Sequence, residues 1–144
     1  MSIEVNKDLV RRLWYQEFWD NRNTDLAGDL FTPDYVLHMA GIPGTVDREG
    51  IKQLPHVFGD AFGLTHAVDE IVAEGSTVAA RWTVRGIHEG EFQGIAPTRK
   101  QVEISGITIH HLTDGKIRES WVIFDSMTLL QQLGVVAGPA QTAA

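Results

Sequence analysis

The strongest constraint on the fold is a long hairpin pattern in the last third of the chain. Two β-rich runs, 103–112 and 117–125, flank the dipeptide Asp114-Gly115. Because glycine readily adopts a positive φ, such a dipeptide between two β-rich runs predicts a tight hairpin turn. A short helix is expected directly afterwards, over 126–133. Asp125 or Ser126 is its expected N-cap, and Gly134 is the residue expected to end it.

The first half of the chain predicts three helices and one strand. Apolar residues recur at helical spacing from Val5 to about Asn21, and Thr24 is a suitable cap for a second, short helix. A strand is expected over 35–40, after the helix-stopping sequence around Pro33. A third helix is expected to begin after Asp47, with a kink or restart at Pro55.

The rest of the chain is rich in β-structure. We expect strands over 65–73 and 77–89, a glycine- and proline-containing connection over 90–99, and then the hairpin. Helices followed by long strands that succeed one another through turns indicate an α+β fold, a curved antiparallel sheet packed against three N-terminal helices. Residues 1–144 are predicted to form one domain, with a flexible tail over 135–144.

Composition excludes several classes of function. The 144 residues carry a formal net charge of -7, which argues against nucleic acid or an anionic membrane as a partner. The absence of cysteine excludes thiol catalysis, Cys-ligated metal and disulfides. The N-terminal residues lack the pattern of a signal peptide, and no apolar run is long enough to span a membrane, so a cytoplasmic location is expected.

Several segments together resemble one family, the SnoaL-like polyketide (ester) cyclases of the nuclear transport factor 2-like superfamily. The resemblance extends from about Asn6 to Gly134 and implies a cone-shaped α+β fold. The segments that carry it are Pro33-Asp34-Tyr35, Asp47 to Ile51, Gly86 to Thr98, Val102 to Ile107, Asp114 to Ile117, Trp121, Asp125 and Leu129 to Gly134.

The resemblance also implies a chemistry. Cyclases of this family close a ring by an intramolecular aldol step without metal or organic cofactor, using an Asp on the last strand as general acid/base. Alignment through the hairpin turn and the last helix places that Asp at Val122. The supporting Gln and His fall at Gly106 and Thr108, and the residue before Trp121, often His in the family, is Ser120. The first-strand Asn or His falls at Leu37 or His38, depending on a one-residue gap.

The candidate catalytic residues are therefore His38 and His110. If the strand facing of the family holds, His110 points into the cone, where a near-neutral pKa suits acid/base chemistry. The alternative interpretation is an inert, hydrogen-bonded histidine at the open end of the sheet. His38 either lines the pocket or is a hydrogen-bonded core histidine. The residues expected to bind substrate are Trp14, Leu37, Trp82, Thr108, Ser120, Val122 and Phe124.

The remaining polar candidates have simpler interpretations. Asp125 is interpreted as a helix cap rather than a catalytic residue. His111 is expected on the outer face, and His88 either at the mouth of the pocket or in solvent. His56 and His66 have no partner that the sequence identifies. Arg81, Thr83 and Arg85 alternate with Trp82 and lie on the outer face. The resemblance implies that this face, together with Trp121 and Ile123, forms a homodimer surface, and the alternative is an ordinary solvent-exposed sheet face.

Two functional hypotheses follow. The first is a cofactor-free cyclase or isomerase acting on a hydrophobic polyketide-type molecule, relying on His38 or His110 or on pocket shape alone. The second is a non-catalytic ligand-binding or interaction domain of the same fold. No helical metal-binding motif, phosphate-binding loop or nucleophile elbow occurs in the sequence, so neither a metal nor a cofactor is expected.

Overall fold

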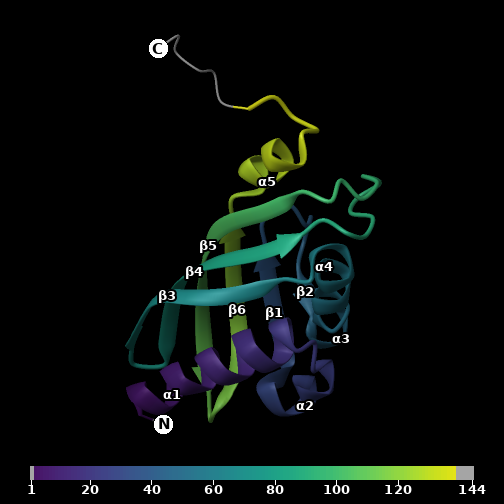
Figure 1. Cartoon of the computed structure of the whole chain (residues 1–144). Helices are drawn as coiled ribbons and strands as arrows, with labels where there is room; N and C mark the ends of the chain where they lie inside the picture. Colours follow the sequence, from purple (N-terminus) through teal and green to yellow (C-terminus); the bar gives the residue numbers. More distant parts are fainter. Residues whose placement is uncertain (1, 139–144) are drawn as a thin grey trace.

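A computed structural model describes residues 2–138. It has helical segments in the first half of the chain, a six-stranded sheet, and one helix after the last strand (Figure 1). The helical elements are α1 (Ile3–Leu9), η1 (Val10–Asp20), η2 (Thr24–Leu26), α2 (Ala27–Leu30), α3 (Arg48–Ile51), α4 (Leu54–Phe62) and α5 (Ser126–Leu133). The strands are β1 (Phe31–Met39), β2 (Val46–Asp47), β3 (Thr65–Glu74), β4 (Thr77–Ile87), β5 (Gln101–Thr113) and β6 (Lys116–Phe124).

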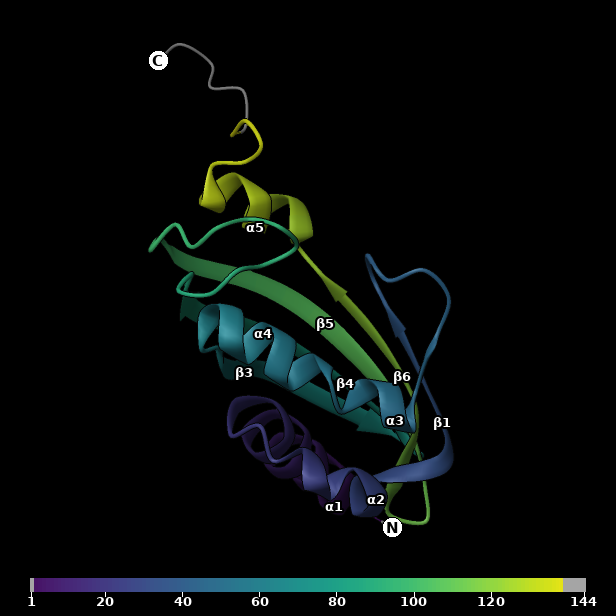
Figure 2. The same cartoon turned by 90° about the vertical axis from the view of Figure 1, so that its right-hand side faces the viewer.

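The sheet is curved and open, with strand order β2-β1-β6-β5-β4-β3. Its concave side holds α1, α3 and α4, while α5 lies beyond the end of β6 (Figure 2). This is the predicted α+β arrangement, with three helical segments before the long strands. One pair departs from the expected antiparallel pattern, because β1 runs parallel to β6. The strands of a parallel pair need a long connection between them, and here everything from β2 to β5 provides it.

The first helix differs from the α-helix that the apolar spacing predicts. From Val10 to Asp20 it is π-helical, and its last turn closes with a hydrogen bond from the Asn21 amide to the Gln16 carbonyl at 2.9 Å. Bonds that join residues five apart bring side chains at that spacing onto one face. The rings of Trp14 and Trp19 accordingly meet with centroids 5.8 Å apart. The helix therefore presents more aromatic side chains to the sheet than an α-helix would.

The predicted hairpin turn and the Asp47 cap are confirmed. The predicted Thr24 cap is wrong, because Thr24 is the first residue of η2 and Asn23 stands at the N-cap position without a side-chain hydrogen bond. Asp114 and Gly115 both adopt positive φ, 50° and 77°, in the β5–β6 turn. Asp47 caps α3 by accepting the Gly50 amide at 2.7 Å. The third helix restarts at Leu54 with Pro55 in its first turn, where a missing amide hydrogen costs no helical bond.

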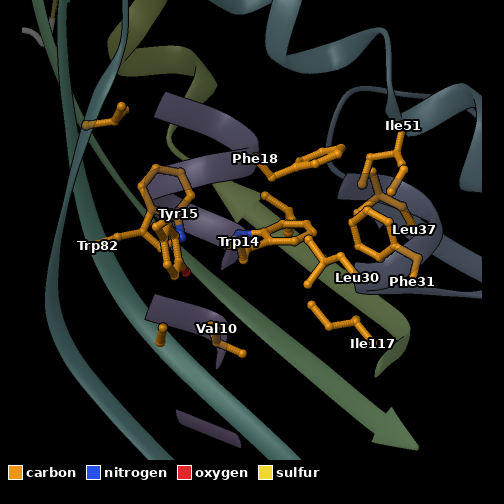
Figure 3. Close-up of a cluster of buried hydrophobic side chains, with 14 of the residues drawn as sticks. Val10, Trp14, Tyr15, Phe18, Leu30, Phe31, Leu37, Ile51, Trp82 and Ile117 are labelled. Atoms are coloured by element: carbon orange, nitrogen blue, oxygen red, sulfur yellow. The ribbon is translucent and has the colours of Figure 1, made fainter. Parts of the chain in front are cut away.

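The core lies between η1 and the concave face of the sheet. Figure 3 shows Trp14 at its centre, with Phe18 beside it on the same helix and Leu30 and Phe31 from the segment that follows. Strand β1 begins at Phe31, four residues earlier than predicted, and its register with β6 shifts between Phe31 and Val36. Pro33 lies inside this irregular stretch, where its missing amide breaks no regular ladder bond.

Candidate functional site

An apolar chamber occupies the concave side of the sheet, beneath η1 and α4. The volume open to the centre of a water molecule is only about 50 Å³, because aromatic rings fill much of the space. We call this space the inner chamber. Its walls are Trp14, Tyr15, Trp19, Met39, Phe58, Phe62, Leu64, His66, Trp82, Val84, Val102, Ile104, Thr108, Val122, Phe124 and Leu129.

One wall is built by Trp82 lying across Gly106. A Cβ on Gly106 would come within 2.3 Å of the Trp82 ring and 2.8 Å of the Ile123 carbonyl oxygen, so no larger residue fits there without displacing the indole. The Trp82 Nε1–H donates to the Thr108 hydroxyl at 2.9 Å. With its oxygen occupied as an acceptor, the Thr108 hydroxyl is left free to donate its own hydrogen.

Among the polar wall residues of the inner chamber, His66 is paired with Asp20, which is not itself part of the wall. Asp20 ends the π-helix, and His66 stands at the start of β3. The Asp20 carboxylate accepts the His66 backbone amide at 3.0 Å and lies 2.6 Å from the ring Nδ1. A carboxylate can only accept, so Nδ1 carries the hydrogen and Nε2 is the basic nitrogen. Both side chains are largely buried, with 8% of the His66 and 16% of the Asp20 side chain exposed.

His66 is surrounded by aromatic rings. The centroids of Trp82, Tyr15 and Trp19 lie 5.2, 5.5 and 6.2 Å from that of the imidazole. Burial raises the pKa of the Tyr15 phenol well above its ordinary value, an effect that the Thr108 side chain opposes in part. Tyr15 is therefore a neutral hydroxyl at physiological pH. The chamber thus combines one histidine, one neutral phenol and one threonine hydroxyl in an otherwise apolar wall.

His110 lies behind this wall rather than in it. It is fully buried, its Nδ1 is 2.7 Å from the Ser120 Oγ, and its ring packs against Trp14 with centroids 4.5 Å apart. Burial, with a smaller contribution from His111, lowers the pKa of His110 to about 3. The imidazole is therefore neutral and hydrogen-bonded inside the core. This placement matches the inert interpretation of the residue more closely than the catalytic one.

His38 lies on the opposite face of the sheet. Its Nε2 is 2.7 Å from Glu119 Oε2, and its ring stacks on Trp121 with centroids 5.0 Å apart and an interplanar angle of 10°. The possibility that His38 lines the pocket is therefore wrong. The reason is strand alternation: Tyr35 and Leu37 point to the core, so His38 points away.

Most of the expected substrate-binding residues do line the inner chamber. These are Trp14, Trp82, Thr108, Val122 and Phe124. Leu37 and Ser120 do not line it. Both are fully buried in the core outside the walls of the chamber. Tyr15 also lines the chamber and was not predicted, because the helical pattern placed Leu13, Trp14 and Phe18 on the packing face. The His66–Asp20 pair was not predicted either, since its two members are 46 residues apart. A lone histidine at a strand start is the only local signal of that pair.

The other polar side chains singled out in the sequence lie outside the inner chamber. Asp125 caps α5 by accepting the Thr128 amide at 3.0 Å and hydroxyl at 2.6 Å, and these bonds lower the pKa of its carboxyl. His88 is neither at a mouth nor in solvent, but buried against Thr98. His111 packs on the outer face against Trp121, as predicted.

The C-terminal end follows the predicted order. Gly134 ends α5 with φ 80°. Residues 135–138 follow outside helix and strand, and the rest of the predicted tail lies outside the described residues.

No cluster of three or more His, Cys, Asp or Glu side chains suited to a metal ion occurs between residues 2 and 138. Within the same range, the helices are all too short or too polar to cross a membrane.

A curved sheet wrapped around helices, with an apolar chamber in its concavity, defines a protein of the nuclear transport factor 2-like fold. The family model for SnoaL-like polyketide cyclases matches residues 9–133, and the chain belongs to that family. No match was found among curated proteins.

Solved structures agree with this assignment. AclR, a candidate hydroxylase from Streptomyces galilaeus, is 27% identical over 97% of this chain and 87% of its own, with a TM-score of 0.84. IdmH, a candidate polyketide cyclase from Streptomyces antibioticus, is 32% identical over 90% of this chain and 98% of its own, with a TM-score of 0.79. A SnoaL-like protein from Jannaschia, 23% identical over 95% of both chains with a TM-score of 0.83, shares the fold.

Proposed function

We propose that this protein is a cofactor-free cyclase or isomerase that acts on a hydrophobic polyketide-type molecule bound in the inner chamber. The family assignment and the likeness to a candidate polyketide cyclase support the class of reaction. The observation that carries the proposal is the His66–Asp20 pair, a positioned base in a chamber whose other walls are almost entirely apolar. The catalytic role that the sequence suggested for a histidine is assigned to His66.

In this proposal His66 Nε2 removes a proton from the carbon next to a substrate carbonyl. Asp20 fixes the tautomer through Nδ1 and stabilises the imidazolium that forms, as a carboxylate partner does in other histidine-based sites. An imidazole ring can both accept a proton and return it, which suits a base that must also reprotonate its product. Closing the ring then needs the substrate held in a reactive conformation, which the aromatic walls provide.

The developing enolate oxygen needs a hydrogen-bond donor. Tyr15 and Thr108 supply hydroxyl groups in the same chamber, and a neutral phenol in an apolar site is a strong donor to an oxyanion. Val122 stands where resemblance to the family places the catalytic Asp. On this account the base has moved from the last strand to the start of β3, on the other side of the chamber.

Proton exchange tests the proposal without knowledge of the natural substrate. The assay follows α-proton exchange of 2-tetralone, a small aromatic ketone, in D₂O by NMR. The wild type is expected to accelerate exchange, and His66→Gln to slow it by about 100-fold or more, the range that general base catalysis commonly supplies. His56→Gln is the matched control, since His56 is exposed and bonds only to Thr24 among the described side chains. Equal rates for the two variants would contradict the proposal.

A non-catalytic binding domain is the second candidate, favoured by Val122 in place of an acid. It predicts that 2-tetralone binds, as followed by the fluorescence of the chamber tryptophans, while the wild type exchanges no faster than buffer. Binding together with exchange that depends on His66 excludes it.

We also propose that two copies associate through the outer face of the sheet. Ile107, Ile109 and Ile123 on this face are 52%, 39% and 67% exposed, an apolar surface next to Trp121. Ion pairs flank it, among them Arg85 with Glu103 at 2.6 Å. A central apolar strip with a charged rim is typical of protein interfaces.

A further inference from the structure

A second hollow adjoins the inner chamber at the end of the sheet where β1 and β6 finish. We call it the outer hollow. The volume open to the centre of a water molecule is about 370 Å³ in the outer hollow, compared with about 50 Å³ in the inner chamber. It is bounded by the loop after β1, by α4, by the connection after β4 and by α5 (Figure 2). Its walls are Met39, Ala40, Gly41, Ile42, Leu54, Val57, Phe58, Glu91, Phe92, Gln93, Phe124, Ser126, Leu129 and Leu130.

The two spaces share a partition. Met39, Phe58, Phe124 and Leu129 line both of them. The Phe58 and Phe124 rings meet edge to face, with centroids 6.3 Å apart and an interplanar angle of 85°. Because the same four side chains line both spaces, rotation of these side chains is the motion by which the spaces would join.

The inner chamber alone is too small for the proposed substrate. A single water needs about 10–15 Å³ by this measure, so about 50 Å³ corresponds to a few waters. A polyketide-type molecule that reaches His66 must therefore extend past the partition. The space it would enter is mainly apolar, and its polar side chains Glu91, Gln93 and Ser126 are all exposed.

We propose that the substrate is an elongated molecule that occupies both spaces. Its reacting carbonyl end lies beside His66, its apolar body crosses the Phe58–Phe124 partition, and its far end lies in the outer hollow. Glu91 is the one charged side chain in the described walls of the outer hollow, so the far end carries a hydrogen-bond donor such as a hydroxyl, not a carboxylate. This inference rests on the proposed function, since it places the two ends of the substrate relative to His66.

Ligand length tests the inference. Binding of the n-alkanols from butanol to decanol is measured by titration calorimetry. If both spaces are used, affinity rises about fourfold for each added methylene through the whole series, the gain expected for burying one CH₂ group. Affinity that stops rising at a short chain would restrict the site to the inner chamber and overturn the inference. Failure of every alkanol to bind would overturn it as well.

Two substitutions locate the far end. Val57 lines only the outer hollow and is 52% exposed, so Val57→Glu is expected to weaken decanol binding at least tenfold and leave butanol binding unchanged. Val5→Glu is the control, because Val5 is 46% exposed on α1 and lines neither space. Equal effects of the two variants on decanol would overturn the inference.

The result is separable from the test of the proposed function. Exchange of the compact ketone 2-tetralone depends on His66 and does not require a chain that reaches the far end of the outer hollow. A plateau in the alkanol series with normal exchange refutes the two-space site and leaves the acid/base proposal standing. A steady rise with no exchange refutes the catalytic role of His66 and leaves a site for an elongated ligand.

Discussion

Single residues decide the shape of the inner chamber, and Gly106 shows this most clearly. The Trp82 indole covers it, so a methyl group at this position would meet ring carbons at 2.3 and 2.5 Å. The same indole forms one wall and holds the Thr108 hydroxyl. Glycine at this position is therefore required by the packing of an aromatic neighbour.

Gly106→Ala is expected to lower the free energy of unfolding by about 1–3 kcal/mol, the usual cost of overpacking a core. Gly28→Ala is the control, because a Cβ there meets nothing within 4 Å and alanine favours its helix. Urea denaturation measures both variants. Trp82→Phe in the Gly106→Ala background should recover part of the loss, and equal stability of the two single variants would contradict the explanation.

His110 makes stability depend on pH. Its pKa in the folded protein, about 3, lies below the value of 6.5 expected for the unfolded chain. The unfolded state therefore binds the proton more readily, and the stabilisation present above pH 6.5 is lost as pH falls toward 3. Between pH 7 and pH 4.5 the loss from this group is roughly 2–3 kcal/mol.

His110→Gln removes this titration. In urea denaturation at the two pH values, the wild type should lose roughly 2–3 kcal/mol more than the variant. An identical pH dependence for both proteins would show that His110 is not held neutral by burial.

At the scale of elements, Asp20 joins the end of the π-helix to the start of β3. Its two carboxylate oxygens take the His66 backbone amide and ring, so one side chain fixes both the helix end and the base. The helix and strand thus meet at the proposed site, and the position of His66 depends on the geometry of η1.

Asp20→Ala is expected to cost about 1–3 kcal/mol of stability, because it leaves a part-buried amide without its acceptor. Asp20→Asn should cost less, since its oxygen can still accept the His66 amide. Both should slow 2-tetralone exchange, because neither holds Nδ1 through a charged acceptor. Thermal unfolding and exchange rates measured on the same samples check the two effects, and unchanged exchange in Asp20→Ala would separate Asp20 from the site.

Local signals predicted most of the elements. The Asp114-Gly115 turn, the Asp47 and Asp125 caps and the restart of the third helix at Leu54 depend on neighbouring residues, so the sequence carries them directly. The π-helix was missed because its aromatic run also suits an α-helical pattern. The parallel β1–β6 pair depends on contacts between segments some 80 residues apart, which periodicity does not encode.

The family resemblance and strand alternation also predicted part of the site. The strand facing that the resemblance implies placed Thr108 and Val122 on the inner face, and alternation added Trp82; all three line the chamber. Neither signal reached the His66–Asp20 contact, because that contact depends on how a helix end meets a strand start. The histidine singled out by its position in the hairpin, His110, lies instead in the packed core.

At the scale of the whole molecule, the sheet separates two surfaces with different roles. The concave side holds the chamber, and the outer side carries the exposed isoleucines proposed as a dimer surface.

Ile123→Asp is expected to convert a dimer into a monomer, because it places a charge at the most exposed of these residues. Light scattering after size exclusion measures the mass, with Val57→Asp in the wall of the outer hollow as a control. A monomeric wild type would contradict the dimer.

The most direct test of the central claim compares two titrations of one sample. The rate of 2-tetralone exchange is followed against pH, and the ring nitrogens of His66 are followed by ¹⁵N NMR over the same range. The account predicts a Nδ1-protonated tautomer, a rate that rises as His66 loses its Nε2 proton, and one midpoint for both curves. A rate that is flat across the His66 titration, or that persists in His66→Gln, would contradict the claim that His66 is the base.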